Sequence, residues 1–91
     1  MENHKLTLEV TGKVQGVFFR ASTLEQANIL GLTGTVKNLQ NGNVRIVAEG
    51  IKDSLNLLHE WCKIGPERAI VNSIDAKWET ADNNFNTFKI I

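Results

Sequence analysis

The chain has 91 residues, of which 42% are hydrophobic and 22% charged, a balance that fits one globular domain (1–91) and excludes a disordered chain. Ten basic residues match ten acidic ones, so the net charge is zero and a general nucleic-acid binder is disfavoured. The single cysteine, Cys62, cannot form an internal disulfide, and no apolar run reaches the roughly 18 residues that span a bilayer. With no secretory signal at the N-terminus, the expected location is cytoplasmic, with no membrane association.

The first part of the chain predicts a strand followed by a helix. Over residues 6–14, leucine and valine alternate with polar residues, which is typical of a half-buried strand. Ser22 stands three residues before Glu25, the spacing of a capping box, and apolar residues at helical spacing continue to Gly31. We therefore expect a helix over about 22–31.

A hairpin and a second helix are expected in the middle of the chain. Asn41-Gly42 separates two strand-like segments and predicts a tight two-residue turn between them. Asp53 or a neighbour caps the following helix, which Gly65-Pro66 ends. The apolar stripe of this helix consists of Leu55, Leu58, Trp61 and Cys62.

The last part of the chain contributes two strands. Apolar residues alternate with polar ones over 69–79, and a short strand follows at 85–91 after a polar turn. The element order is therefore βαββαβ plus a terminal strand. This order predicts an α+β fold, a ferredoxin-like βαββαβ sandwich in which two helices cover one face of an antiparallel sheet with a short fifth terminal strand.

The loop between the first strand and the first helix, TGKVQGVFFRAS (11–22), combines glycines with one arginine. The first N–H groups of a helix have no intrahelical partners and attract anions, and Gly16 permits backbone angles that turn successive N–H groups toward one point. Arg20 follows where its guanidinium can bind two oxygens of a tetrahedral anion. A phosphate-like guest fits this loop, but from the loop alone an ordinary connection with a solvated arginine fits equally well.

The residue types absent from this loop restrict its chemistry. It has no Gly-Lys-Ser/Thr ending, and Val14 stands where a cysteine-dependent phosphatase has its nucleophile, six positions before Arg20. Residues 13–19 contain no serine, cysteine or carboxylate, and the histidines and cysteine lack metal-ligand spacing, so the sequence shows no metal cluster. Water must then attack directly, which positioning and electrostatics support only for an activated phosphate such as a carboxyl phosphate.

Two motifs resemble the acylphosphatase family. GKVQGVFFR (12–20) resembles its first signature and GLTGTVKNLQNGNVRIVAEG (31–50) its second. The similarity covers nearly the whole chain in order, and the family's ferredoxin-like fold agrees with the element order. The resemblance implies hydrolysis of a small-molecule acyl phosphate to a carboxylate and inorganic phosphate, without a metal or organic cofactor.

The resemblance also assigns residues to this reaction. Arg20 matches the phosphate-binding arginine of the family, and Asn38 matches the asparagine that orients the attacking water, so these two are the expected catalytic residues. The loop amides that bind the phosphate match Gln15, Gly16, Val17, Phe18, Phe19 and Arg20. With no side-chain base available, the substrate phosphate itself can accept the water's proton.

For other residues, structural or surface roles stand beside a functional one. Thr23 and Lys13 are left open as supporting groups for the site, a plain surface role being favoured for Lys13. One of Phe18 and Phe19 is expected to anchor the loop to the core. Cys62 lies on the apolar stripe of the second helix and is interpreted as a buried, inert thiol rather than a nucleophile.

Other functions compete with hydrolysis, because the fold alone decides none of them. An RNA-binding module of this topology stacks bases on aromatic residues of a central strand, and 43–50 has none, so no nucleic-acid partner is expected. A regulatory domain for a small metabolite does not need both Arg20 and Asn38. A larger carbamoyl-handling protein with such a domain is disfavoured by the 91-residue length, and a monomer is the expected state.

Overall fold

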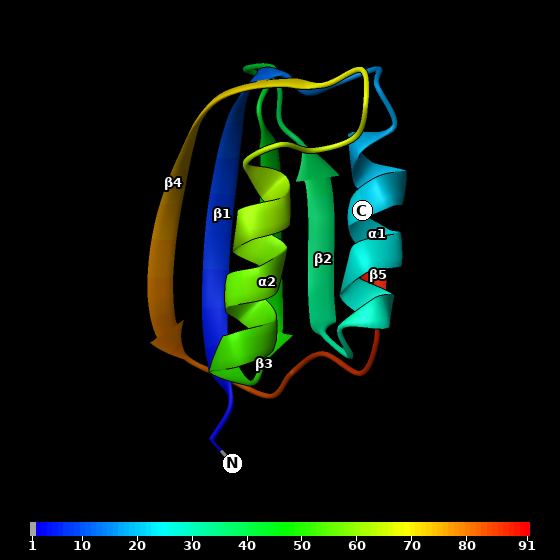
Figure 1. Cartoon of the computed structure of the whole chain (residues 1–91). Coiled ribbons are helices and arrows are strands. Elements are labelled where there is room, and N and C mark those ends of the chain that lie inside the picture. The colour runs from blue at the N-terminus through cyan, green and yellow to red at the C-terminus, as the bar shows by residue number, and fades with distance from the viewer. Residues whose placement is uncertain (1) are drawn as a thin grey trace.

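The computed structural model describes residues 2–91 and consists of a five-stranded sheet with two helices on one face (Figure 1). In chain order its elements are β1 (His4–Lys13), α1 (Phe19–Ile29), β2 (Thr33–Asn38), β3 (Val44–Gly50), α2 (Lys52–Cys62), β4 (Ile70–Thr80) and β5 (Phe88–Ile90). The strand order β4-β1-β3-β2-β5 confirms the expected ferredoxin-like α+β sandwich. Within residues 2–91, neither helix has the length and apolar character needed to cross a bilayer.

The sheet differs from the expectation at its β5 edge. β5 pairs with β2 in parallel, Gly34 with Phe88 and Val36 with Ile90, whereas the other neighbouring strands are antiparallel. The sheet is therefore mixed. The cause is the route of the chain, since segment 81–87 runs along the end of the sheet at which β2 begins and enters β5 from there (Figure 1).

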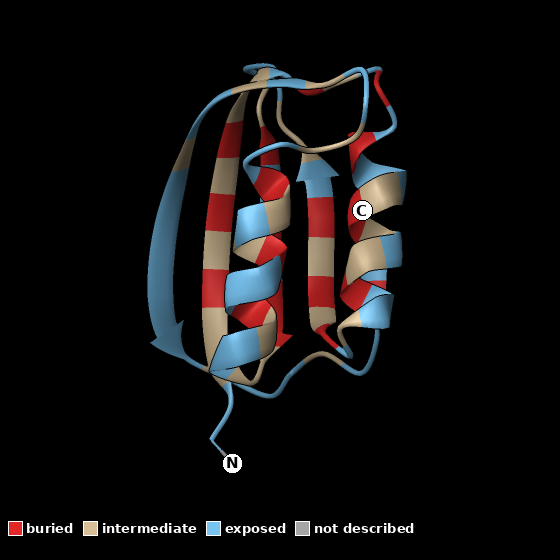
Figure 2. Ribbon diagram, viewed as in Figure 1, coloured by how far each residue is buried: buried red, intermediate tan, exposed pale blue. Residues whose placement is uncertain are grey.

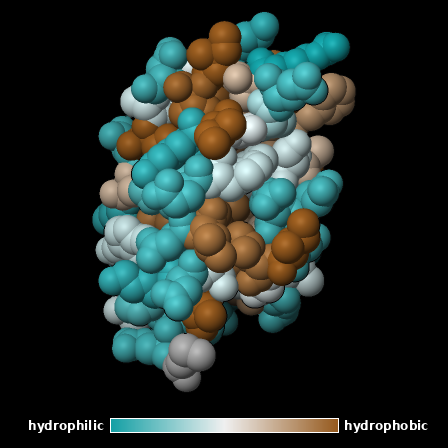
Figure 3. Space-filling view, viewed as in Figure 1, coloured by the Kyte–Doolittle hydropathy of each residue, from teal (hydrophilic) through white to brown (hydrophobic). Residues whose placement is uncertain are grey.

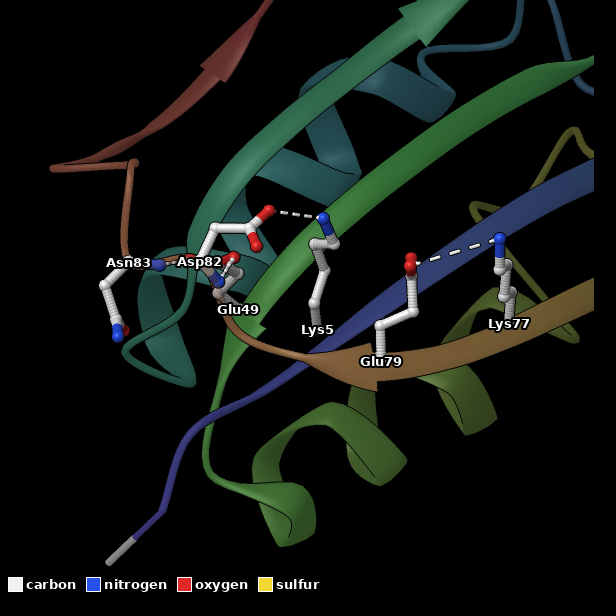
Figure 4. A network of polar contacts seen from close by, with 6 residues as sticks. All are labelled: Lys5, Glu49, Lys77, Glu79, Asp82 and Asn83. Atoms are coloured by element: carbon white, nitrogen blue, oxygen red, sulfur yellow. Dashed lines mark hydrogen bonds and ion pairs between the residues drawn. The ribbon is translucent and has the colours of Figure 1, made fainter.

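A buried carboxylate fixes the segment between β4 and β5. Glu49, near the end of β3, is 3% exposed and accepts hydrogen bonds from the N–H groups of Asp82 (2.9 Å) and Asn83 (3.1 Å). Lys5 of β1 binds the Asp82 carboxylate at 2.6 Å (Figure 4). Because a buried carboxylate needs donors, these contacts hold the crossing segment against the sheet and help to place β5 beside β2.

Alternate residues of the central strands and one stripe of each helix form the core (Figure 2). Its strand residues include Leu6, Leu8, Val10, Val36, Val44, Ile46 and Ala48, and its helix residues include Phe19, Ala27, Leu55, Leu58 and Cys62. This burial confirms the alternation expected over 6–14 and the stripe of the second helix, of which only Trp61 is partly buried. The surface on the helix side carries separate apolar patches among hydrophilic side chains (Figure 3).

The first helix begins three residues earlier than the capping pattern predicts. The N-cap residue of α1 is Phe18, which makes no side-chain capping bond, and the Ser22 N–H already donates to the Phe18 carbonyl at 3.0 Å. The expected capping box therefore does not form. Burial explains the earlier start, because Phe19 is 1% exposed and packs against Trp61 of α2 with 5.5 Å between ring centroids. Gly31, with φ +70°, follows the end of the helix as expected.

The connections around β3 also differ in detail from the expectation. Leu39 and Asn43 pair through a 2.8 Å hydrogen bond, so the hairpin loop has three residues, 40–42, and the predicted two-residue turn is wrong. The Gly42 N–H donates to the Leu39 carbonyl, and Gly42 alone takes the left-handed conformation, with φ +93°. At the start of α2 the N-cap residue is Ile51, and Asp53 lies in the first turn without a capping bond.

Candidate active site

An open pocket lies where the loop after β1, the first turn of α1, the end of β2 and β5 meet. It encloses about 340 Å³ and is lined by Val14, Gly16, Phe18, Phe19, Arg20, Ala21, Asn38 and Ile90. The two residues expected to be catalytic, Arg20 and Asn38, therefore face one pocket although they lie on different elements. The apposition of α1 and β2 in the fold creates this proximity.

The backbone of the loop offers hydrogen-bond donors without a partner in the part of the chain that the structure describes. Gly16 has φ +74° and Phe18 has φ +65°, so two positions of this short loop are left-handed. Among residues 2–91, no hydrogen bond donated by the N–H groups of residues 15–21 is found, and the first donor in this region is the N–H of Ser22. Alternating backbone handedness followed by a helix N-terminus gathers N–H groups into an anion-binding concavity.

Arg20 is the second residue of α1 and is exposed. Within residues 2–91 it forms no ion pair, and the lining of the pocket contains no carboxylate. The first turn of α1 also contains no acidic residue, so the positive end of the helix dipole is not neutralised there. The guanidinium and the helix start thus present positive charge to the pocket without an internal counter-ion.

Asn38 closes β2 and is half-buried opposite Val44 of β3. Its side-chain oxygen is buried and has no hydrogen-bond partner within the described part of the chain. A buried acceptor without a partner costs about 1–3 kcal/mol, and structural sites normally avoid this cost. A side-chain amide both donates and accepts, so this group can hold a water molecule at the edge of the pocket.

Gln15 connects the two halves of the site, a role that the sequence patterns did not reveal. Its side chain does not line the pocket, and its Nε2 donates to the carbonyls of Leu39 (2.8 Å) and Asn43 (3.0 Å). Both acceptors flank the three-residue hairpin loop that follows β2. The Gln15 side chain therefore ties the loop after β1 to the hairpin that follows β2, the strand that carries Asn38. No periodic pattern in the sequence indicates this contact.

The other predicted loop residues divide between the core and the surface. Val17 (4% exposed) and Phe19 are buried, which confirms that one phenylalanine anchors the loop, whereas Phe18 is 75% exposed. The buried Thr23 hydroxyl donates to the Phe19 carbonyl at 2.7 Å and does not line the pocket. Lys13, at the end of β1, is exposed and likewise outside the lining.

The side chain that could indicate a thiol nucleophile, Cys62, lies outside the pocket lining. Cys62 is fully buried in α2, where burial raises the pKa of its thiol to about 12, as an inert core residue would show. Within residues 2–91 there is no group of three or more histidine, cysteine, aspartate and glutamate side chains arranged to hold a metal ion.

Ile90 of β5, expected only as a strand residue, does line the pocket, because the parallel pairing with β2 brings it there.

Comparison with known proteins agrees with the resemblance of the two sequence motifs. The acylphosphatase family model matches residues 6–90. An acylphosphatase from Marinobacter nauticus is 54% identical over 82 residues, which cover 90% of this chain and 89% of that protein.

Solved structures agree with this match. The acylphosphatase from Coxiella burnetii has a TM-score of 0.92 at 40% identity, with 99% of this chain and 94% of that chain covered. The acylphosphatase from Bacillus subtilis has a TM-score of 0.93 at 32% identity, with coverage of 97% and 98%. The matches extend over both sequence motifs and over every element that lines the pocket, and on this ground the chain belongs to the acylphosphatase family.

Proposed function

We propose that the chain hydrolyses the carboxyl-phosphate bond of acyl phosphates to a carboxylate and inorganic phosphate, without a metal or organic cofactor. Membership of the acylphosphatase family makes it a hydrolase of acid anhydrides. The observation that carries the finer proposal is the shared pocket, where Arg20, Asn38 and a loop with unused N–H groups meet.

The phosphoryl group binds first in this mechanism. The N–H groups of Gln15, Gly16, Val17, Phe18, Phe19 and Arg20 donate to its oxygens. The Arg20 guanidinium adds a bidentate, charge-assisted contact. Fixed donors of this kind stabilise the charge on the transferring group in the transition state, because they need no reorganisation when the reaction occurs.

Water attacks in the second step. The side-chain amide of Asn38 holds the water in line with the phosphorus–carboxylate bond. A bond forms between the water oxygen and phosphorus, and the carboxylate leaves with the electron pair of the broken bond. A phosphate oxygen accepts the water's proton, since the pocket lining contains no carboxylate, imidazole or thiol to act as a base. The low basicity of the carboxylate makes this route sufficient.

Two substitutions test the division of roles. Hydrolysis of benzoyl phosphate is measured in the presence of a chelator, and inorganic phosphate serves as a competitive inhibitor that reports binding. Arg20→Gln is expected to abolish both turnover and inhibition. Asn38→Ala is expected to keep phosphate inhibition while kcat falls by about 10²–10³, the effect typical of removing one well-placed polar group.

The matched control is Lys37→Ala, which removes an exposed neighbour of Asn38 on the opposite side of the strand and should leave kcat unchanged. A wild-type chain without turnover above background contradicts the proposed hydrolysis. An Asn38→Ala variant that loses phosphate inhibition but keeps its rate at saturation contradicts the role given to Asn38.

A further inference from the structure

Phe18 combines an exposed ring with an unusual backbone conformation. Its φ of +65° and ψ of +23° lie in the left-handed region, where glycine and asparagine are favoured and a bulky residue is an outlier. The residue is 75% exposed, so burial in the core does not offset the backbone strain. Strained residues of this kind concentrate at ligand sites, where the strain serves the ligand.

Phe18 shares the lining of the pocket with two other apolar side chains, Ile90 and Val14. Ile90 of β5 lines the same pocket and is 41% exposed, and Val14 lines it from the buried side. The pocket therefore has an apolar wall as well as the polar wall formed by Arg20, Asn38 and the loop backbone. A cavity of about 340 Å³ lies in the range of small-molecule sites and is larger than a phosphate group requires.

The charges of the pocket restrict what the apolar wall can bind. Arg20 is the one charged side chain among the lining residues. In the proposed mechanism its guanidinium is occupied by the phosphate, so a second anionic group on the acyl part finds no cation in the pocket. An uncharged acyl group that extends out of the phosphate site contacts Phe18 and Ile90 instead and removes their apolar surface from water.

We propose that Phe18 and Ile90 form the acyl-binding wall of the pocket and select acyl phosphates with an apolar acyl group, above all an aromatic one. An aromatic acyl group stacks on the Phe18 ring while its phosphate is held by Arg20 and the loop amides. The inference rests on the proposed function and names the substrate class of the same site. Phe18 and Ile90 are specificity-determining residues in this arrangement and take no part in the bond-breaking step.

The test compares two substrates that share the phosphate but differ in the acyl group, acetyl phosphate and benzoyl phosphate. Phe18→Asn removes the ring and keeps a residue that tolerates the left-handed backbone, and Ile90→Thr keeps the β-branched shape of the strand residue. The control Ile64→Thr removes an apolar side chain that is 77% exposed and lies outside the pocket lining. Each variant is compared with the wild type separately for each substrate, so the different reactivities of the two substrates cancel.

We expect Phe18→Asn and Ile90→Thr each to lower kcat/KM for benzoyl phosphate by about 2- to 10-fold, the range of one aromatic or apolar contact. Ile90→Thr should change kcat/KM for acetyl phosphate and the inhibition constant of inorganic phosphate by less than twofold. The Phe18 N–H contact is common to both substrates, so an effect of Phe18→Asn on the loop backbone should lower kcat/KM equally for both, and the loss for benzoyl phosphate should exceed the loss for acetyl phosphate by about 2- to 10-fold. Ile64→Thr should change neither substrate. Equal losses for both substrates, or no loss for either, overturn the acyl-binding wall while hydrolysis itself stands. A wild type that hydrolyses neither substrate overturns the proposed function, and this inference with it.

Discussion

Replacing Gln15 with leucine tests whether the loop and the hairpin of the site act as one unit. The change removes the hydrogen bonds from Nε2 to the carbonyls of Leu39 (2.8 Å) and Asn43 (3.0 Å) and keeps a side chain of similar size. Each acceptor retains a backbone donor, because Gly42 donates to Leu39 and Leu39 donates to Asn43. No buried acceptor is left unpaired, so the loss of stability is about 1–3 kcal/mol, the net worth of two hydrogen bonds.

The expected kinetic effect follows from the same geometry. A chain of this length is stable by about 5–14 kcal/mol, so the variant still folds and its activity can be measured. If the Gln15 link holds Asn38 in position relative to Arg20, kcat for benzoyl phosphate falls by about 10- to 100-fold, since about 1.4 kcal/mol corresponds to a factor of ten. Inhibition by inorganic phosphate changes little, because the loop amides and Arg20 remain.

Asn41→Ala supplies the matched control for this prediction. The Asn41 side chain accepts a 3.0 Å hydrogen bond from the Asn43 N–H in the same hairpin, and within residues 2–91 it makes no hydrogen bond to the loop after β1. Its loss should lower stability in a urea titration and leave kcat intact. A Gln15→Leu variant with reduced stability and an unchanged kcat would refute the reasoning, since Gln15 would then support the fold without positioning Asn38.

Two further predictions concern packing and titration. Gly65→Ala should destabilise the chain by about 1–3 kcal/mol more than Gly31→Ala. Both glycines have φ +70°, but a methyl group on Gly65 would lie 2.7 Å from Phe19 Cε2, and one on Gly31 would meet nothing within 4 Å; equal losses in urea titrations would contradict the steric argument. Burial raises the pKa of the Cys62 thiol from 9.0 to about 12, so above pH 9 the unfolded chain releases a proton that the folded chain keeps. Stability should be unaffected by this group below pH 9 and fall by up to about 1.4 kcal/mol per pH unit between pH 9 and 12. A Cys62→Ala variant should lack this slope, and parallel curves over pH 8–11 would rule out the assignment.

The strands were predictable because their signal is local. In β1 the side chains of Leu6, Leu8 and Val10 are all fully buried, and their spacing of two follows directly from the pleat of a strand. The glycine stop after α1 was predictable for a similar reason, since Gly31 supplies a left-handed angle that most residues avoid. The prediction of Arg20 and Asn38 as a pair rested on the motifs, and their shared pocket agrees with it, while their chemical roles stay predictions.

The errors arose where distant contacts outweigh local preference. Nothing near Phe19 in the sequence indicates that its ring packs on Trp61, yet this contact accompanies the earlier start of α1. The direction of β5, and hence the place of Ile90 in the pocket, depends on which end of the sheet the chain crosses. The Gln15 contacts likewise exist only once the first loop and the hairpin lie side by side.

The anchoring of the loop explains how its N–H groups can stay free of internal partners. A loop with unused donors tends to rearrange until the donors are satisfied, unless its side chains hold the backbone in place. Here Val17 and Phe19 enter the core, and Gln15 binds the neighbouring hairpin. These contacts fix the backbone from two directions, so the N–H groups that the proposed mechanism assigns to the phosphate are already arranged before it binds. The proposed metal-free mechanism depends on such preorganisation, because donors that are already in place stabilise the transition state without first having to be ordered.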